Sequence, residues 1–167
     1  MASPTVYDRL ILALPSVVIA VLLVLCALPI SWQYGPLTPH VVWLAALTIG
    51  ALAPASWPVT VAFVFGLISD LIFGTPLGAQ ALLSLFLTLY VQNQARRTSH
   101  QLFTLRWAEA AMVLLVLYLM LWALVGFIMP ERPPLRGVLI GAAVSMGWFP
   151  IFYFGARELV KLLPART

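Results

Sequence analysis

Long apolar segments alternate along the chain with short connections rich in proline, glycine and polar residues. Segments such as residues 10–14 (Leu-Ile-Leu-Ala-Leu) do not alternate apolar and polar positions, as the strands of a membrane β-barrel would. The pattern predicts an all-α membrane protein, a bundle of six transmembrane helices at about residues 10–28, 37–53, 59–73, 79–91, 107–129 and 137–155. A basic amphipathic tail, residues 156–167, is predicted to continue the last helix into the lipid headgroups.

The second, third and fourth segments are short, and only a few residues connect them. The second is either a half-helix over residues 41–52 or a full span that begins near Leu37. Short segments with tight connections favour a compact bundle core over long helices that face lipid. We expect a small-residue packing face in the sixth segment, at Gly137, Gly141 and Ala142.

Composition supports this prediction and excludes a soluble domain. The 167 residues are 63% hydrophobic and 8% charged, whereas a soluble domain averages about 25% charged residues. We therefore expect one integral membrane domain over residues 1–167. The single cysteine, Cys26, excludes an intrachain disulfide. The net charge of +4 does not indicate nucleic-acid binding, because the basic residues flank hydrophobic segments, where they set topology.

The basic residues predict the orientation. Six spans place both termini on one side, together with seven of the nine basic residues: Arg9, Arg96, Arg97, Arg106, Arg157, Lys161 and Arg166. The positive-inside rule puts that side in the cytoplasm. Arg96, Arg97 and Arg106 border the most polar stretch, residues 92–106, and are candidates to contact a cytoplasmic protein or acidic lipid. The alternative is that they serve only as topology-setting charge.

One carboxylate, Asp70, lies inside an apolar segment. An ionisable group at membrane depth costs at least about 2.5 kcal/mol unless it faces protein or water, so Asp70 needs compensation. It is either a buried structural carboxylate at a helix break or a direct contact for a ligand or partner. Ser69, Thr75 and Gln80 are the expected polar neighbours.

Small residues surround this acid. Gly66, Asp70 and Gly74 share one helix face, because residues four apart are neighbours on a helix, and two glycines there would let another backbone approach. Gly74, Pro76 and Gly78 then break the chain. The candidate pocket or partner contact comprises Gly66, Asp70, Gly74, Pro76, Gly78 and Gln80.

The residue pattern does not indicate a catalytic site. An aspartyl dyad needs two carboxylates at one site, but Asp70 is the only acid well inside a predicted span, since Glu109 opens the fifth. His40 and His100 are predicted on opposite sides of the membrane. No serine-hydrolase or zinc-protease motif occurs. We therefore predict a non-enzymatic protein without metal or cofactor.

Residues 66–82 read Gly-Leu-Ile-Ser-Asp-Leu-Ile-Phe-Gly-Thr-Pro-Leu-Gly-Ala-Gln-Ala-Leu. This stretch resembles the rod shape-determining protein MreD family, which carries a similar Gly-Leu-x-x-Asp-hydrophobic-x-x-Gly-x-x-Leu-Gly pattern. The length, six spans, cytoplasmic termini and polar loop after the fourth span agree with that family. The family's fold looks like that of the substrate-binding S components of energy-coupling-factor transporters.

The resemblance implies a multi-pass scaffold in the bacterial inner membrane. Such proteins bind the bitopic protein MreC and associate with MreB, with the glycosyltransferase RodA and with its transpeptidase, and so help to organise lateral peptidoglycan synthesis and cell shape. Membrane lipids are the other expected contacts. The alternative hypothesis is a subunit of a membrane transporter that binds a small molecule or lipid, similar to an S component. An autonomous transporter is disfavoured because the sequence shows no clear inverted repeat.

Overall fold

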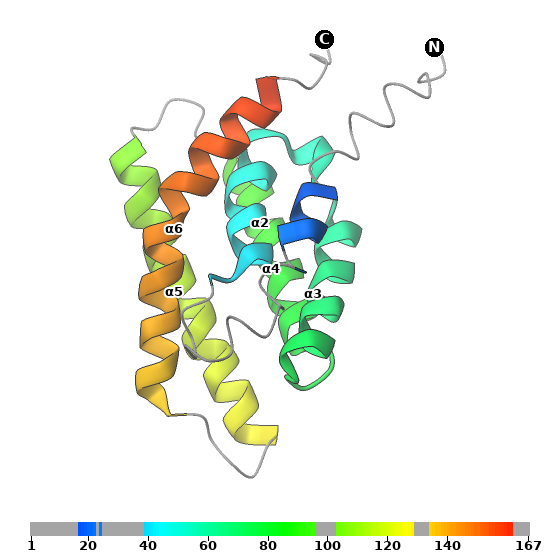
Figure 1. Cartoon of the computed structure of the whole chain (residues 1–167), viewed down its shortest axis with the longest axis vertical. Helices are drawn as coiled ribbons and strands as arrows, with labels where there is room; N and C mark the ends of the chain where they lie inside the picture. Colours follow the sequence, from blue (N-terminus) through cyan, green and yellow to red (C-terminus); the bar gives the residue numbers. More distant parts are fainter. Residues whose placement is uncertain (1–16, 23, 25–38, 96–102, 129–133, 162–167) are drawn as a thin grey trace.

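The computed structural model describes residues 17–22, 24, 39–95, 103–128 and 134–161, and these ranges contain helices and connections but no strand (Figure 1). Of the first predicted span, only residues 17–22 and 24 fall within them, and these are helical. The remaining helices are α2 (Val41–Leu52), the 3₁₀ helix η2 (Pro54–Ser56), α3 (Val59–Phe73), α4 (Ala79–Ala95), α5 (Phe103–Ile128) and α6 (Leu135–Lys161).

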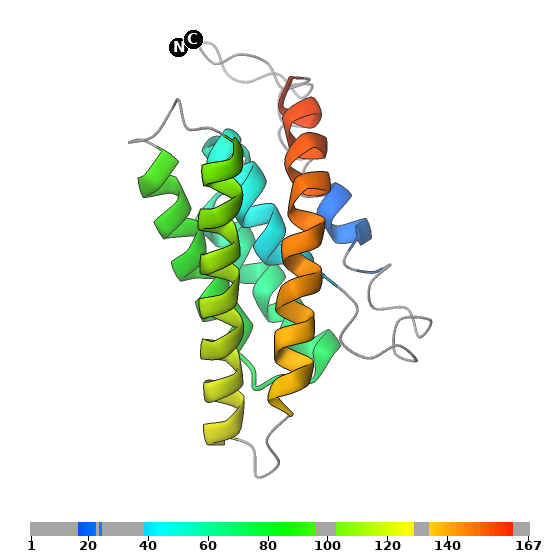
Figure 2. The same cartoon turned by 90° about the vertical axis from the view of Figure 1, so that its left-hand side faces the viewer.

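The helices pack as two antiparallel pairs around α2. α3 packs along α4, α5 packs along α6, and α2 contacts both α4 and α6 (Figures 1 and 2). The turn between α3 and α4 lies at one end of the bundle, which we call the Asp70 end. At the opposite end, the Arg106 end, α4 finishes, α5 begins and α6 finishes (Figure 1). The two ends carry different polar groups and are described separately below.

Helix α2 forms the centre of the core. Val42, Trp43 and Leu44 are completely buried, and most of the other α2 residues are buried as well. A helix that is apolar on every side is expected at such a position. The helix begins at Val41, so a helix starting near Leu37 is wrong. The reason is His40, which has non-helical backbone angles (φ −78°, ψ 86°) and donates its N–H to Ser145 Oγ.

Within the described ranges, α5 and α6 are each long and apolar enough to cross a membrane, whereas α2 and α3 are shorter apolar helices. α5 starts at Phe103 and α4 continues to Ala95, so both ends of the polar stretch 92–106 are helical. Gln92 stabilises the extended end of α4 because its Nε2 donates to the Trp57 carbonyl at 2.8 Å. α6 runs on to Lys161, so the first part of the predicted basic tail, residues 156–161, is helical.

A small residue lets α5 and α6 pack closely. Gly141 of α6 faces the Tyr118 ring of α5, and a Cβ at this position would lie 3.0 Å from Tyr118 Cε1. Gly141 and Ala142 are buried, as expected of the small-residue packing face. The Tyr118 hydroxyl shares a 2.9 Å hydrogen bond with Ser145 Oγ. This contact joins α5 and α6 to the start of α2, because Ser145 also accepts the His40 N–H.

Candidate functional site

The Asp70 carboxylate lies near the end of α3 and binds the start of α4. It is 1% exposed. It accepts hydrogen bonds from the backbone N–H groups of Gly78 (2.8 Å), Gln80 (3.0 Å) and Ala81 (3.4 Å), and from Thr75 Oγ1 (2.6 Å). The first N–H groups of a helix have no partner within that helix, and α4 begins at Ala79. Asp70 therefore supplies the N-terminal cap of α4 from the preceding helix, where a negative charge also complements the helix dipole.

The turn between α3 and α4 depends on two glycines with positive φ. Gly74 ends α3 in the left-handed conformation (φ 65°), and Gly78 precedes α4 with φ 94°. Thr75 N–H returns to the Asp70 carbonyl at 3.1 Å, and Ala79 N–H bonds to the Pro76 carbonyl at 3.0 Å. These angles suit glycine because it has no Cβ. The turn thus folds back far enough for the side chain of Asp70 to reach the next helix.

The two flanking glycines have different roles. A Cβ on Gly66 would lie 2.5 Å from Ala81 Cα, so the expected close approach of a second backbone is confirmed there. A Cβ on Gly74 would meet no atom within 4 Å, so the same expectation is wrong for Gly74. Gly74 lies beyond the last residue of α3 and serves backbone conformation instead.

Gln80 extends the polar contacts of Asp70 into the bundle. Its Nε2 donates to Thr75 Oγ1 at 2.9 Å, and the residue is 1% exposed. Thr75 and Gln80 are thus confirmed as polar neighbours of Asp70. The third expected neighbour, Ser69, is also buried, but its hydroxyl makes no hydrogen bond within the described part of the chain.

His40, which sequence analysis did not select, faces Gln80 from the start of α2. The imidazole stacks on Trp43 with ring centroids 3.8 Å apart and presents an edge to Tyr118 at 6.1 Å. The Gln80 side chain faces the imidazole. Both ring nitrogens of His40 and Oε1 of Gln80 are buried and make no hydrogen bond within the described residues.

These residues form a buried polar chain across the bundle. It runs from Asp70 through Thr75 and Gln80 to His40 and on to Ser145 and Tyr118, so it touches α3, α4, the start of α2, α6 and α5. Buried polar groups are nearly always hydrogen-bonded in folded proteins. The Asp70 half of the chain obeys this rule, whereas the His40 half has acceptor and donor capacity left over. The two halves can therefore serve different purposes.

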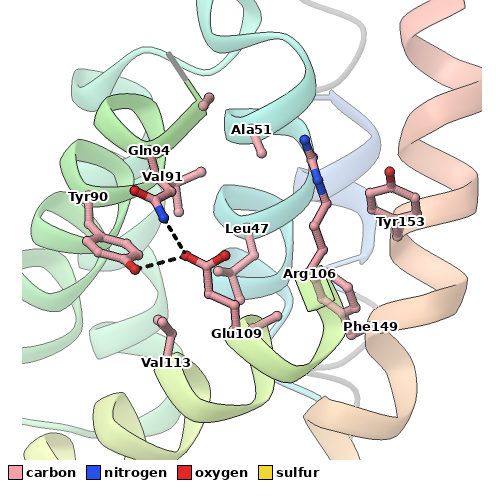
Figure 3. Close-up of a pocket in the computed structure, with 12 residues that line it drawn as sticks. Leu47, Ala51, Tyr90, Val91, Gln94, Arg106, Glu109, Val113, Phe149 and Tyr153 are labelled. Carbon is pink, nitrogen blue, oxygen red and sulfur yellow. Dashed lines mark hydrogen bonds between the residues drawn. The ribbon is translucent and has the colours of Figure 1, made fainter. Parts of the chain in front are cut away.

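A separate pocket lies at the Arg106 end, with a volume of about 50 Å³ (Figure 3). Its polar members come from the end of α4, the start of α5 and the last part of α6. The Glu109 carboxylate accepts hydrogen bonds from Tyr90 Oη at 2.9 Å and from Gln94 Nε2 at 3.2 Å. The lining residues are Leu47, Ala51, Tyr90, Val91, Gln94, Ala95, Arg106, Glu109, Ala110, Val113, Phe149 and Tyr153.

Of the three residues of the predicted basic contact, one lies within the part of the chain that the structure describes. Arg106 lines this pocket from the first turns of α5, while Arg96, Arg97 and His100 lie outside the described residues. Glu109 sits two turns into α5 and does not open the helix, because α5 begins earlier than the predicted span. Across the described ranges, no three His, Cys, Asp or Glu side chains are grouped so as to hold a metal ion.

Comparison with known proteins identifies one related family. The family model described as rod shape-determining protein MreD matches residues 8–154 of the 167. The match includes the Asp70 turn, the buried polar chain and every residue that lines the Arg106-end pocket. No curated protein matches significantly, and no solved structure does.

Proposed function

This chain belongs to the rod shape-determining protein MreD family, and from that premise we propose that it is a non-enzymatic scaffold of the bacterial elongation complex. It lies in the inner membrane as a six-span bundle similar to an S component, with both termini in the cytoplasm. It binds MreC and acts with RodA, its transpeptidase and, indirectly, MreB. In this way it helps to organise lateral peptidoglycan synthesis and cell shape.

The observation that carries the scaffold proposal is the set of hydrogen bonds that the Asp70 carboxylate accepts. Its carboxylate is buried, and four donors of the same chain, all at the start of α4 or in the turn before it, already bind it. A carboxylate accepts about four hydrogen bonds. The motif around Asp70 therefore fixes the α3–α4 pair, which favours the structural interpretation over direct contact with a ligand.

Exposed apolar side chains support placement in a membrane with room for partner helices. On α5, Met112 is 70% and Phe127 is 91% exposed, and Leu71 of α3 is 69% exposed. Such faces are stable against acyl chains or against another transmembrane helix, where packing of side chains drives association. The long outer surface of α5 is thus available to a bitopic partner.

We expect crosslinking in cells to recover the partners that this proposal names. Photo-crosslinkers at exposed positions of α5 and α3, such as Met112 and Leu71, would be compared with one at the buried position Leu114. Mild-detergent purification and mass spectrometry should find a bitopic MreC-like protein and cell-wall synthases on the exposed positions only. Recovery of an ATPase and a transmembrane coupling subunit instead would refute the scaffold and support a transporter subunit.

The transporter-subunit alternative rests on the His40 half of the buried polar chain. Unpaired buried acceptors and donors at His40 and Gln80 are what a site for a small polar molecule would offer. If so, a screen of small molecules should find a compound that raises the melting temperature of the wild type by several degrees but not that of His40→Phe. Phe keeps the stacking on Trp43 and removes the ring nitrogens. A scaffold predicts no such compound.

A further inference from the structure

The pocket at the Arg106 end holds two opposite charges that point apart. Arg106 and Glu109 are one turn apart on α5. The Arg106 guanidinium extends toward Ala51 and Tyr153, whereas the Glu109 carboxylate extends toward Tyr90 and Gln94 (Figure 3). The two side chains therefore line different parts of the pocket.

Hydrogen bonds hold Glu109 in this direction. Tyr90 Oη and Gln94 Nε2 both donate to its Oε1, and both come from the last turns of α4. A carboxylate has about four acceptor positions, so Oε2 retains capacity for further donors. The carboxylate is thus fixed on one wall of the pocket with an acceptor still to offer.

Apolar side chains form the rest of the pocket. Val91 and Phe149 belong to the hydrophobic core, and Leu47 and Val113 pack against it. The volume of about 50 Å³ is that of a small pocket. In the proposed orientation the Arg106 end faces the cytoplasm, so the pocket lies at the depth of the headgroups of the inner leaflet.

We propose that this pocket binds a phosphoethanolamine group, as carried by phosphatidylethanolamine. The phosphate pairs with the Arg106 guanidinium, whose fork of N–H donors matches phosphate oxygens. The primary ammonium donates to Glu109, and the acyl chains stay in the bilayer. Phosphatidylglycerol offers no donor cation to Glu109, and the quaternary ammonium of phosphatidylcholine has no N–H to donate. This inference goes beyond the scaffold function and depends only on the proposed membrane orientation.

Binding of lipids with identical acyl chains to the purified full-length chain tests the proposal, with native mass spectrometry as the readout. Phosphatidylethanolamine should bind about tenfold more tightly than phosphatidylcholine, the factor that one charge-assisted hydrogen bond supplies. Glu109→Gln should abolish this preference, and Arg106→Gln should weaken both lipids. The matched controls Arg136→Gln and Glu158→Gln, at exposed positions outside the pocket, should bind like the wild type.

A soluble competitor, glycerophosphoethanolamine, distinguishes the source of the group. Lipid selectivity without measurable binding of the competitor assigns the site to a membrane lipid, and tight competitor binding that Glu109→Gln removes assigns it to a soluble phosphoethanolamine. Equal binding of the ethanolamine and choline lipids by the wild type overturns the proposal. A preference for the ethanolamine lipid that persists in Glu109→Gln also overturns the proposal, provided that circular dichroism shows the variant folded. Failure here would leave the recovery of MreC and the synthases unaffected.

Discussion

Asp70→Ala is expected to lower the free energy of unfolding by about 3–5 kcal/mol, because it leaves several buried donors without an acceptor at a cost of about 1–3 kcal/mol each. The backbone N–H groups of Gly78 and Gln80 lose the carboxylate that accepts their hydrogen bonds, and the Thr75 hydroxyl loses its 2.6 Å hydrogen bond to Asp70. The left-handed turn at Gly74 then has no side chain that ties it to α4. Equilibrium unfolding of the purified full chain in mixed micelles, followed by tryptophan fluorescence, measures the loss.

Two graded variants keep this prediction testable if Asp70→Ala does not fold. Asp70→Asn keeps one acceptor oxygen but turns an NH₂ group toward backbone donors, so its loss should be intermediate. Thr75→Val removes one donor to Asp70 and also the acceptor of Gln80 Nε2, and should cost about 1–3 kcal/mol. The control Glu158→Ala breaks only the exposed pair with Lys161 and should change stability by less than about 0.5 kcal/mol. A loss below about 1 kcal/mol for Asp70→Ala would contradict the capping role.

The contacts of Asp70 could be anticipated from the sequence because they are local. An acid in an apolar segment needs donors, and the glycines and proline that follow bend the chain back within ten residues, so Thr75 and Gln80 were the natural neighbours. The different roles of the two flanking glycines could not be predicted. Gly66 and Gly74 look equivalent at helical spacing, yet α3 ends at Phe73, so only Gly66 lies on the packed face.

The two other polar sites depend on contacts between distant segments. His40 and Gln80 are forty positions apart, and Ser145 is farther still, so only the packing of α2 between α4 and α6 brings them together. Glu109 was not predicted to line a site for a different reason. The predicted fifth span began at residue 107, which placed this acid at the helix opening, whereas the helix from Phe103 carries it inward beside Tyr90. An error of one turn in a helix boundary thus hid a charged pocket.

Gly66→Ala is the second substitution with a large expected effect, and it acts without removing any polar group. The new Cβ would lie 2.5 Å from Ala81 Cα, 2.9 Å from Ala81 N and 3.0 Å from the Gln80 carbonyl oxygen. All three are backbone atoms of α4, so no side chain can rotate away. Carbon atoms pack at about 3.5–4.0 Å, so α3 and α4 must separate by about 1 Å. We expect a loss of about 3 kcal/mol, at the upper end of overpacking costs.

Gly147→Ala and Gly155→Ala are the matched controls, because a Cβ at either position of α6 meets open space. Alanine favours a helix over glycine by roughly 1 kcal/mol, so these variants should be neutral or more stable than the wild type. Equal behaviour of Gly66→Ala and the controls would refute the close approach of α3 and α4.

The double variant Gly66→Ala with Asp70→Ala separates packing from capping. Asp70 lies one turn beyond Gly66 on α3, and its carboxylate reaches the same Gln80 and Ala81 backbone that a Cβ on Gly66 would push away. Substitutions that disturb one shared contact are not additive. The double variant should therefore lose less stability than the sum of the two single losses. Full additivity would mean that the acid and the glycine stabilise α4 independently, and the motif would then be two adjacent features and not one structural unit.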